Sequence, residues 1–280
     1  IGGGLLQIAA LKKAKELGYE TYLTDMNEFC PAREHADNFY QINVNDFEGT
    51  ALLAKKLKKE NKISGVYTQG TDAEFTVAYA AEEAGLFSIG SETARKCKNK
   101  VLMRKALLEH GVEDVKFSEA FSYQDCLKAS KEVGYPLYIK PSDNSASRGI
   151  TRVENDEMLE NAFKEATSAL LIESELILES EMIGSEHSVD CVMYKGILYP
   201  AGISDRVFLD KEVFAVQTES ITPSLLNPEI QKAMYKKMEA AAKAIGIKDG
   251  AFKGDLLLDK KGNVRVIEVT ARTSGGFDSQ

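Results

Sequence analysis

The sequence predicts a chain that combines two fold classes, an α/β part followed by an α+β part, in two or three subdomains. Helices and strands alternate from Ile1 to about Ala94, and strand sequence predominates from Ile177 onward. Between these regions lies a small α+β unit around one polar loop, PSDNSASRG. The length of 280 residues supports more than one domain, because single domains usually have ~100–150 residues.

The leading segment is predicted to be a doubly wound αβα domain with a parallel sheet. After the turn Gly2–Gly4, apolar residues recur at helical spacing in LLQIAALKKAKEL, and Gly18 supplies a stop. Strands are expected over residues 19–24, 39–44 and 65–68, and helices over residues 46–60 and 72–84. The turn followed by Asp25 also suggests dinucleotide binding, but GGGLLQ lacks the third glycine of G-x-G-x-x-G.

The remaining elements are predicted from caps, stops and turns. One helix carries Asn99-Lys100 and ends at Gly111, and two later helices are capped by Ser122 and Asn155. The strands LILESEM, EHSVDCVMY and ILYPAGI precede a long helix from Asn227-Pro228 to Gly246. The segment DGAFKGDLLLDKKGNVRVIEVTAR is expected to form a hairpin with a DKKGN turn.

The composition excludes two classes of protein. Lys and Arg number 35 against 43 Asp and Glu, a formal net charge of −8, whereas a general nucleic-acid binder needs a basic face. No apolar run approaches the ~18 residues of a membrane span, and the opening residues do not resemble a signal peptide. Four scattered cysteines without a C-x-x-C pair favour reduced, part-buried thiols in a cytoplasmic protein, namely Cys30, Cys97, Cys126 and Cys191.

Two carboxylates in the predicted hairpin carry the most restrictive chemical signal. Asp255 and Glu268 lie on its opposite arms, each within apolar strand sequence. Facing carboxylates repel one another unless a cation pairs with them, and Mg²⁺ held jointly with substrate phosphates would resolve that conflict. With Lys253 and Arg272 close by, the hairpin is typical of a phosphoryl-transfer site. Solvent-exposed cross-strand ion pairs are the alternative.

Two further segments suit a nucleotide. Lys140 ends an apolar strand and precedes a loop of small and hydroxyl residues, which favours phosphate binding although no Walker A motif is present. A solvated loop is the alternative. Glu179 and Glu186 flank a bend at Gly184. Unpaired backbone groups at such a bend could form hydrogen bonds with the edge of an adenine base, and a carboxylate beyond it could accept hydrogen bonds from ribose hydroxyls. An amphipathic strand edge is the alternative there, and His187 is expected to be a satisfied polar neighbour.

Together and in this order, these segments resemble the ATP-grasp superfamily of carboxylate–amine ligases, and the resemblance runs from Gly2 to Gly276. It implies an ATP-grasp fold with a leading αβα domain over residues 1–94, a linker helix and small mobile lid over residues 95–178, and a large antiparallel catalytic sheet over residues 179–280. ATP would lie between the lid and that sheet. The chain would then be a trimmed part of a longer enzyme.

The resemblance assigns roles residue by residue. Lys100 and Lys140 resemble the two lysines that contact ATP phosphates, and the phosphate loop of the lid corresponds to Ser145, Ser147, Arg148 and Gly149. The adenine hinge corresponds to Glu179, Ser180, Glu181 and Met182, with Glu186 as the ribose ligand. Asp255 and Glu268 match the magnesium carboxylates, and Lys253 and Arg272 match cations that hold the transferring phosphoryl group. Cations concentrated in this way would bind a polyanion despite the net negative charge.

One position departs from the family pattern. The second metal strand of the family usually reads Glu-x-Asn-x-Arg, whereas Thr270 stands here at the middle ligand position. A threonine hydroxyl is expected to bind the second ion more weakly than an amide oxygen would. Because Ser274-Gly275-Gly276 follows, the chain is more similar to the divergent ligases, including amino-acid ligases, than to glycinamide ribonucleotide synthetase.

The resemblance implies an ATP- and Mg²⁺-dependent ligase, with Mn²⁺ as an alternative ion. A substrate carboxylate would become an acyl phosphate and an amine would then displace phosphate. Alternatives with the same nucleotide site are a phosphoribosylamine–glycine ligase of purine synthesis and a bicarbonate-using carboxylase. A nucleotide-binding regulatory protein without turnover is the alternative that Thr270 favours. The expected partners are small-molecule carboxylates and amines, without nucleic acid or membrane. The sequence does not specify the oligomeric state, and the resemblance allows a homodimer, because related ligases commonly dimerise through the leading domain.

Overall fold

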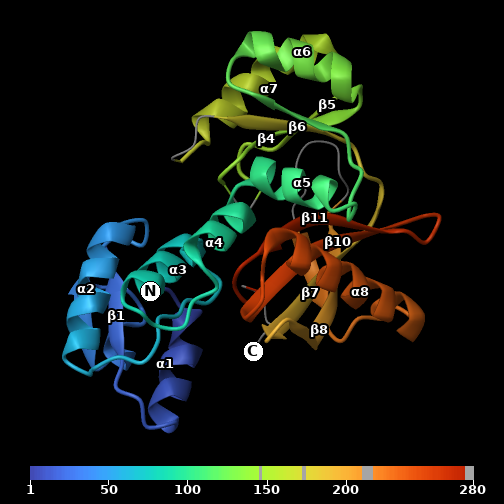
Figure 1. Ribbon diagram of the computed structural model, residues 1–280. Helices are drawn as coiled ribbons and strands as arrows, with labels where there is room; N and C mark the ends of the chain where they lie inside the picture. Colours follow the sequence, from blue (N-terminus) through green and yellow to red (C-terminus); the bar gives the residue numbers. More distant parts are fainter. Residues whose placement is uncertain (145–146, 172–174, 210–216, 275–280) are drawn as a thin grey trace.

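The computed structural model describes residues 1–144, 147–171, 175–209 and 217–274. Figure 1 shows three groups of elements: a leading α/β group, a smaller sheet with two helices, and a larger sheet with one long helix. Helix α5 lies between the smaller and the larger sheet. Within the described residues, no helix is both long and apolar enough to cross a membrane.

The leading group contains fewer strands than predicted. Its elements are α1 (Gln7–Glu16), β1 (Tyr22–Asp25), a 3-10 helix (Arg33–His35), β2 (Asn38–Gln41), α2 (Phe47–Lys59) and α3 (Glu74–Glu83). Strands β1 and β2 pair in parallel, as expected. The predicted strand over residues 65–68 is wrong: this segment joins no sheet among the described residues. It contacts the start of the chain, where the Ile1 ammonium donates to Tyr67 O and the Thr68 hydroxyl donates to Ile1 O.

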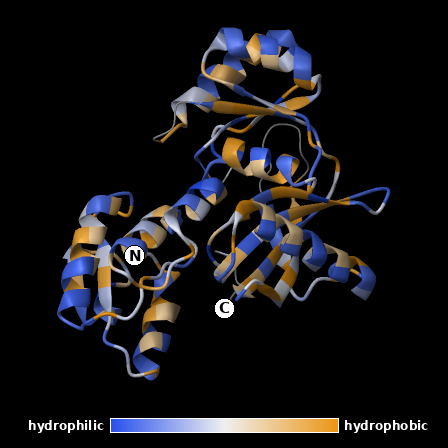
Figure 2. Cartoon of the chain, viewed as in Figure 1, coloured by the Kyte–Doolittle hydropathy of each residue, from blue (hydrophilic) through white to orange (hydrophobic). Residues whose placement is uncertain are grey.

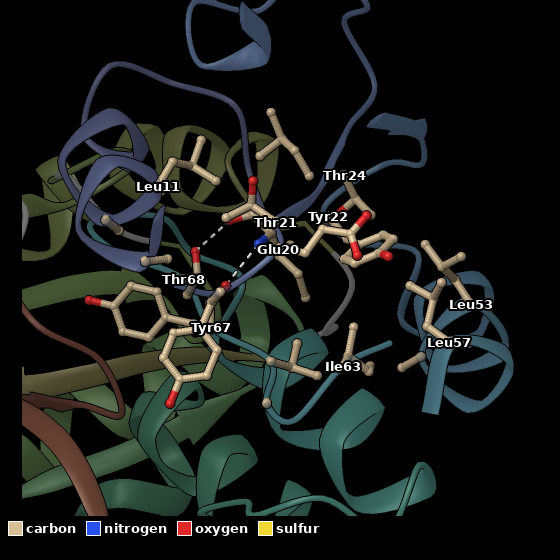
Figure 3. A pocket seen from close by; sticks show the side chains of 18 of the residues that line it. Leu11, Glu20, Thr21, Tyr22, Thr24, Leu53, Leu57, Ile63, Tyr67 and Thr68 are labelled. Atoms are coloured by element: carbon tan, nitrogen blue, oxygen red, sulfur yellow. Dashed lines mark hydrogen bonds between the residues drawn. The ribbon is translucent and has the colours of Figure 1, made fainter. Parts of the chain in front are cut away.

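A cavity of about 370 Å³ separates β1 from that extended segment. Figure 3 shows its apolar walls, which come from α1, α2 and residues 62–68 and include Leu11, Leu53, Leu57 and Ile63. None of the described candidate site residues lines it. The cavity is therefore a feature of the leading group alone.

The helix predicted through Asn99-Lys100 is two helices. These are α4 (Ser91–Lys98) and α5 (Lys100–Glu109), and the chain breaks at Asn99, whose ψ is 112°. The Asn99 side chain accepts from Leu102 N at 3.0 Å and so caps α5. An Asn side chain competes with the helical backbone in this way at N-caps, which explains why helical spacing alone missed the break.

The smaller sheet has the strand order β3-β6-β4-β5 and is antiparallel. Its elements are β3 (Phe117–Ala120), α6 (Tyr123–Val133), β4 (Leu137–Pro141), β5 (Thr151–Val153), α7 (Asp156–Ser168) and β6 (Leu176–Ser180). Ser122 caps α6 and Asn155 caps α7, as predicted. In Figure 1 both helices lie on one side of this sheet, where a buried apolar cluster joins them to it.

The larger sheet has the order β11-β10-β7-β8-β9 and is antiparallel. Its strands are β7 (Gly184–Tyr194), β8 (Ile197–Phe208), β9 (Gln217–Ile221), β10 (Gly250–Asp259) and β11 (Val264–Thr270), with α8 (Pro228–Ile245) packed against it. Figure 2 shows hydrophilic and hydrophobic residues recurring along α8, as expected for a helix with one buried side. The core of this sheet also includes Met103 and Leu107 of α5.

Candidate functional site

The β10–β11 hairpin brings the two predicted metal carboxylates together. Asp255 and Glu268 are directly opposite one another in the antiparallel register. Lys253 Nζ lies 2.9 Å from Asp255 Oδ1 and Arg206 Nη1 lies 3.1 Å from Asp255 Oδ2. Burial raises the pKa of Asp255, but the charges of Lys253 and Arg206 outweigh burial and lower it. Asp255 is therefore ionised at neutral pH, as a metal ligand must be.

Glu268 and Thr270 extend the site along β11. Lys100 Nζ lies 3.7 Å from Glu268 Oε2, and Lys100 also donates to the carbonyl of Asn144. The Thr270 hydroxyl oxygen is buried and has no hydrogen-bond partner among the described residues, so its acceptor capacity is unused there.

These residues fit Mg²⁺ that is completed by a phosphate. The described part of the chain contains no group of three or more His, Cys, Asp or Glu side chains that could hold a metal. Mg²⁺ commonly uses one or two carboxylates together with substrate phosphates and water. The pair Asp255 and Glu268, with the free hydroxyl of Thr270, supplies such an open donor set.

A buried charge cluster lies where the smaller sheet meets α5. Glu179, at the end of β6, is 2% exposed, accepts from Arg104 Nε at 2.8 Å and pairs with Lys140 of β4. Burial raises the pKa of Glu179, but the charges of Arg104 and Lys140 outweigh it and lower the pKa to about 2. Sequence analysis missed Arg104, although its position four residues after Lys100 places both on one face of α5.

The predicted adenine hinge crosses from one sheet to the other. Ser180 is the last residue of β6, and residues 181–183 run outside any strand before β7 begins at Gly184. Glu181 pairs with Arg152 at 2.6 Å, and Met182 is half-buried. On β7, Glu186 lies 3.3 Å from Arg206, so Arg206 contacts both the predicted ribose ligand and Asp255. His187 is satisfied by Ser185 and Asp205, as predicted.

The predicted phosphate loop is described from Ser147 onward, and Ser145 lies outside the described residues. Ser147 and Gly149 have φ values of +58° and +70°. A Cβ at Gly149 would lie 2.5 Å from the Cβ of Ala169, so glycine lets the loop pack closely against the end of α7. Arg148 Nη2 lies 3.4 Å from Asp72 of the leading group.

Asp72 also reaches the end of β11. Its Oδ1 lies 3.4 Å from Arg272 Nη2, so one carboxylate contacts an arginine of the phosphate loop and an arginine beside the metal strand. Near it, Glu74 is 5% exposed and its Oε2 has no hydrogen-bond partner among the described residues. Burial raises the pKa of Glu74, opposed by the charges of Arg272 and Lys98. Sequence analysis missed Glu74 because its position in a helical segment does not distinguish it from an exposed glutamate.

Comparisons with known proteins find relatives of similar sequence and architecture. The model of the ATP-grasp domain matches residues 133–280. Alanine–anticapsin ligase from Bacillus subtilis (strain 168) is 25% identical over 266 residues, which cover 86% of this chain and 56% of the ligase. Carnosine synthase 1 from Homo sapiens is 25% identical over 299 residues, which cover 98% of this chain and 36% of the synthase. The chain spans about half the length of the first curated relatives that it matches.

Solved structures agree with this assignment. The L-amino acid ligase from Bacillus licheniformis superposes with a TM-score of 0.82 at 24% identity, over 97% of this chain and 66% of that one. The biotin carboxylase domain of 2-oxoglutarate carboxylase from Hydrogenobacter thermophilus, a complex with MgADP, has a TM-score of 0.78 at 26% identity, over 97% and 62%. The first likeness establishes the fold, and the predicted ATP-grasp architecture is confirmed. Since the family model covers more than half of its residues, the chain belongs to the ATP-grasp domain family.

Proposed function

We propose that this chain is the nucleotide-binding and catalytic part of an ATP- and Mg²⁺-dependent carboxylate–amine ligase. The observation that carries the proposal is the pairing of Asp255 with Glu268 across the β10–β11 hairpin, within a set of four cations. Three of these cations come from α5, β8 and β10 and the fourth follows β11, and they are Lys100, Arg206, Lys253 and Arg272. Such an arrangement suits phosphoryl transfer, which depends on positioning and on neutralisation of charge.

The reaction needs no acid–base pair in its first step. An oxygen of the substrate carboxylate would attack the γ-phosphorus as its bond to the β,γ-bridging oxygen breaks, which yields ADP and an acyl phosphate. Mg²⁺ held by Asp255 and Glu268 would neutralise phosphate charge. Lys253 and Arg272 would hold the transferring phosphoryl group, and Lys100 and Lys140 the remaining phosphates. The amine, after its ammonium form has lost one proton to solvent, would then attack the acyl carbon as the bond to phosphate breaks, and the nitrogen would lose a second proton to solvent.

We propose that the leading group contributes to the binding site of the amine substrate. Two acidic side chains of the leading group lie near Arg272. Asp72 forms an ion pair with it, and Glu74 feels its charge. Carboxylates next to the reaction centre would attract the ammonium form of an amine substrate. The relatives named as alanine–anticapsin ligase and L-amino acid ligase support amino acids as the first class to test. We also propose that the enzyme is homodimeric and cytoplasmic. The four buried free thiols support the cytoplasmic location, since disulfides are rare there.

The test measures ADP and phosphate released from ATP and Mg²⁺ with amino acids, phosphoribosylamine or bicarbonate as acceptors. Substrate-stimulated release is expected with pairs of amino acids, and Glu268→Gln should abolish it while the far-ultraviolet circular dichroism spectrum stays unchanged. Glu119→Gln is the matched control, because Glu119 forms an exposed pair with Lys105. Full ATP consumption by Glu268→Gln would refute the assignment. Tight binding of ATP and Mg²⁺ without stimulated ADP release would instead support the regulatory alternative.

A further inference from the structure

Arg104 is a buried arginine that serves three acceptors at once. It is 2% exposed. Its Nε donates to Glu179 Oε2 at 2.8 Å, its Nη1 to Val266 O at 2.6 Å and its Nη2 to Ile267 O at 3.0 Å. A buried cation is costly unless charge and hydrogen bonds are well matched. The rigid planar fork of arginine presents separate N–H donors to the carboxylate and to the two carbonyls, whereas a lysine ammonium donates from a single nitrogen.

The three acceptors belong to two parts of the proposed nucleotide site. Glu179 lies on β6, two residues before the hinge segment 181–183 begins. Val266 and Ile267 lie on β11 directly before Glu268, the proposed metal ligand. The guanidinium therefore joins the end of the smaller sheet to the metal strand of the larger one.

Helix α5 makes this connection rigid. Lys100, one turn before Arg104, approaches Glu268 itself at 3.7 Å, and α5 packs into the core of the larger sheet through Met103 and Leu107. Glu179 pairs with both Arg104 and Lys140, so Arg104 would still neutralise this carboxylate if nucleotide phosphates drew Lys140 away. The hinge would then hold its position while the phosphates are bound.

We propose that Arg104 is a positioning residue that couples the nucleotide hinge to the metal carboxylate Glu268. The inference rests on the proposed function. Because one guanidinium holds both parts, binding of the nucleotide base and binding of Mg²⁺ reinforce one another. A residue that only fills the core would leave this reinforcement unchanged.

The experiment measures binding of ADP by isothermal titration calorimetry, with and without Mg²⁺, to the wild type and three variants. The ratio of the two affinities reports the coupling. Arg104→Met removes all three contacts, and Arg104→Lys keeps a charge for Glu179 but cannot serve both carbonyls. Lys105→Met is the matched control, because Lys105 is the next residue of α5 and forms an exposed pair with Glu119.

We expect Mg²⁺ to strengthen ADP binding to the wild type and to Lys105→Met by the same factor. In Arg104→Met that factor should fall about tenfold, the usual effect of removing a partner that orients a metal ligand. Arg104→Lys should bind ADP without Mg²⁺ almost as the wild type does, yet show most of the loss of the Mg²⁺ effect. The lysine variant therefore carries the test if the methionine variant does not fold.

The inference is overturned if the Arg104→Lys variant keeps the wild-type Mg²⁺ effect. It is also overturned if Lys105→Met loses that effect as fully as the Arg104 variants do. Failure of the proposed function looks different: the wild type would then either bind no ADP in this experiment, or bind ADP but show no substrate-stimulated ADP release in the activity assay.

Discussion

The buried carboxylate of Glu179 allows a quantitative test of the structure. Glu179→Gln changes little in size but removes the negative charge between Arg104, at 2.8 Å, and Lys140. Both cations would stay buried without their counter-ion, which in other proteins costs about 3–5 kcal/mol of unfolding free energy. The pKa of Glu179, lowered from 4.5 to about 2, corresponds to a similar size of about 3 kcal/mol at about 1.36 kcal/mol per unit.

The assay is urea unfolding followed by circular dichroism at neutral pH. Glu179→Gln should lose about 3 kcal/mol relative to the wild type. The control Glu119→Gln removes a pair whose side chains are 44% and 40% exposed and should lose roughly 1 kcal/mol or less. A loss for Glu179→Gln equal to that of the control would refute the reasoning.

The same variant has a signature in pH. Because the pKa of Glu179 in the folded protein, about 2, lies below its unfolded value of 4.5, the ionised carboxylate stabilises the wild type fully above pH 4.5. That contribution is lost as the pH falls through the folded pKa. The difference in stability between wild type and Glu179→Gln should therefore narrow as the pH is lowered from 4.5 toward 2.

Three further predictions concern the metal strand, the phosphate loop and a helix cap. Thr270→Asn replaces a hydroxyl that lacks a partner among the described residues by an amide oxygen. It should lower the Mg²⁺ concentration for half-maximal ADP release by roughly tenfold. If that Mg²⁺ concentration is unchanged, Thr270 is not a ligand. Gly149→Ala introduces a Cβ 2.5 Å from that of Ala169 and should raise KM for ATP several-fold. Gly196→Ala, also at positive φ but with open space around it, should leave KM unchanged, and equal effects would contradict the role of the close contact. Asn227→Ala removes the cap that accepts from Ile230 N at 2.9 Å and should lower the free energy of unfolding by ~1 kcal/mol. Because the cap is far from the proposed site in the chain, ADP affinity should stay the same, and a changed affinity would contradict a purely local effect.

The elements that sequence analysis placed well are those whose signals are local. The caps Ser122, Asn155 and Asn227 bind backbone amides within three residues, so their effect does not depend on the rest of the fold. The strand alternation and the DKKGN turn set the hairpin in which Asp255 meets Glu268. The break at Asn99 was missed because helical periodicity continues across it.

The sequence by itself determined the family, through motifs in a fixed order. It also determined that Asp255 and Glu268 lie opposite one another, because period-two strands and one short turn bring them together. Only the tertiary structure decided which charges surround them. Arg104 contacts Glu179 across 75 residues of sequence and Val266 across 162, and Asp72 contacts Arg272 across 200. Spacing along the chain carries no information about such pairs, since they form only when packing of separate helices and sheets brings the side chains within hydrogen-bond distance.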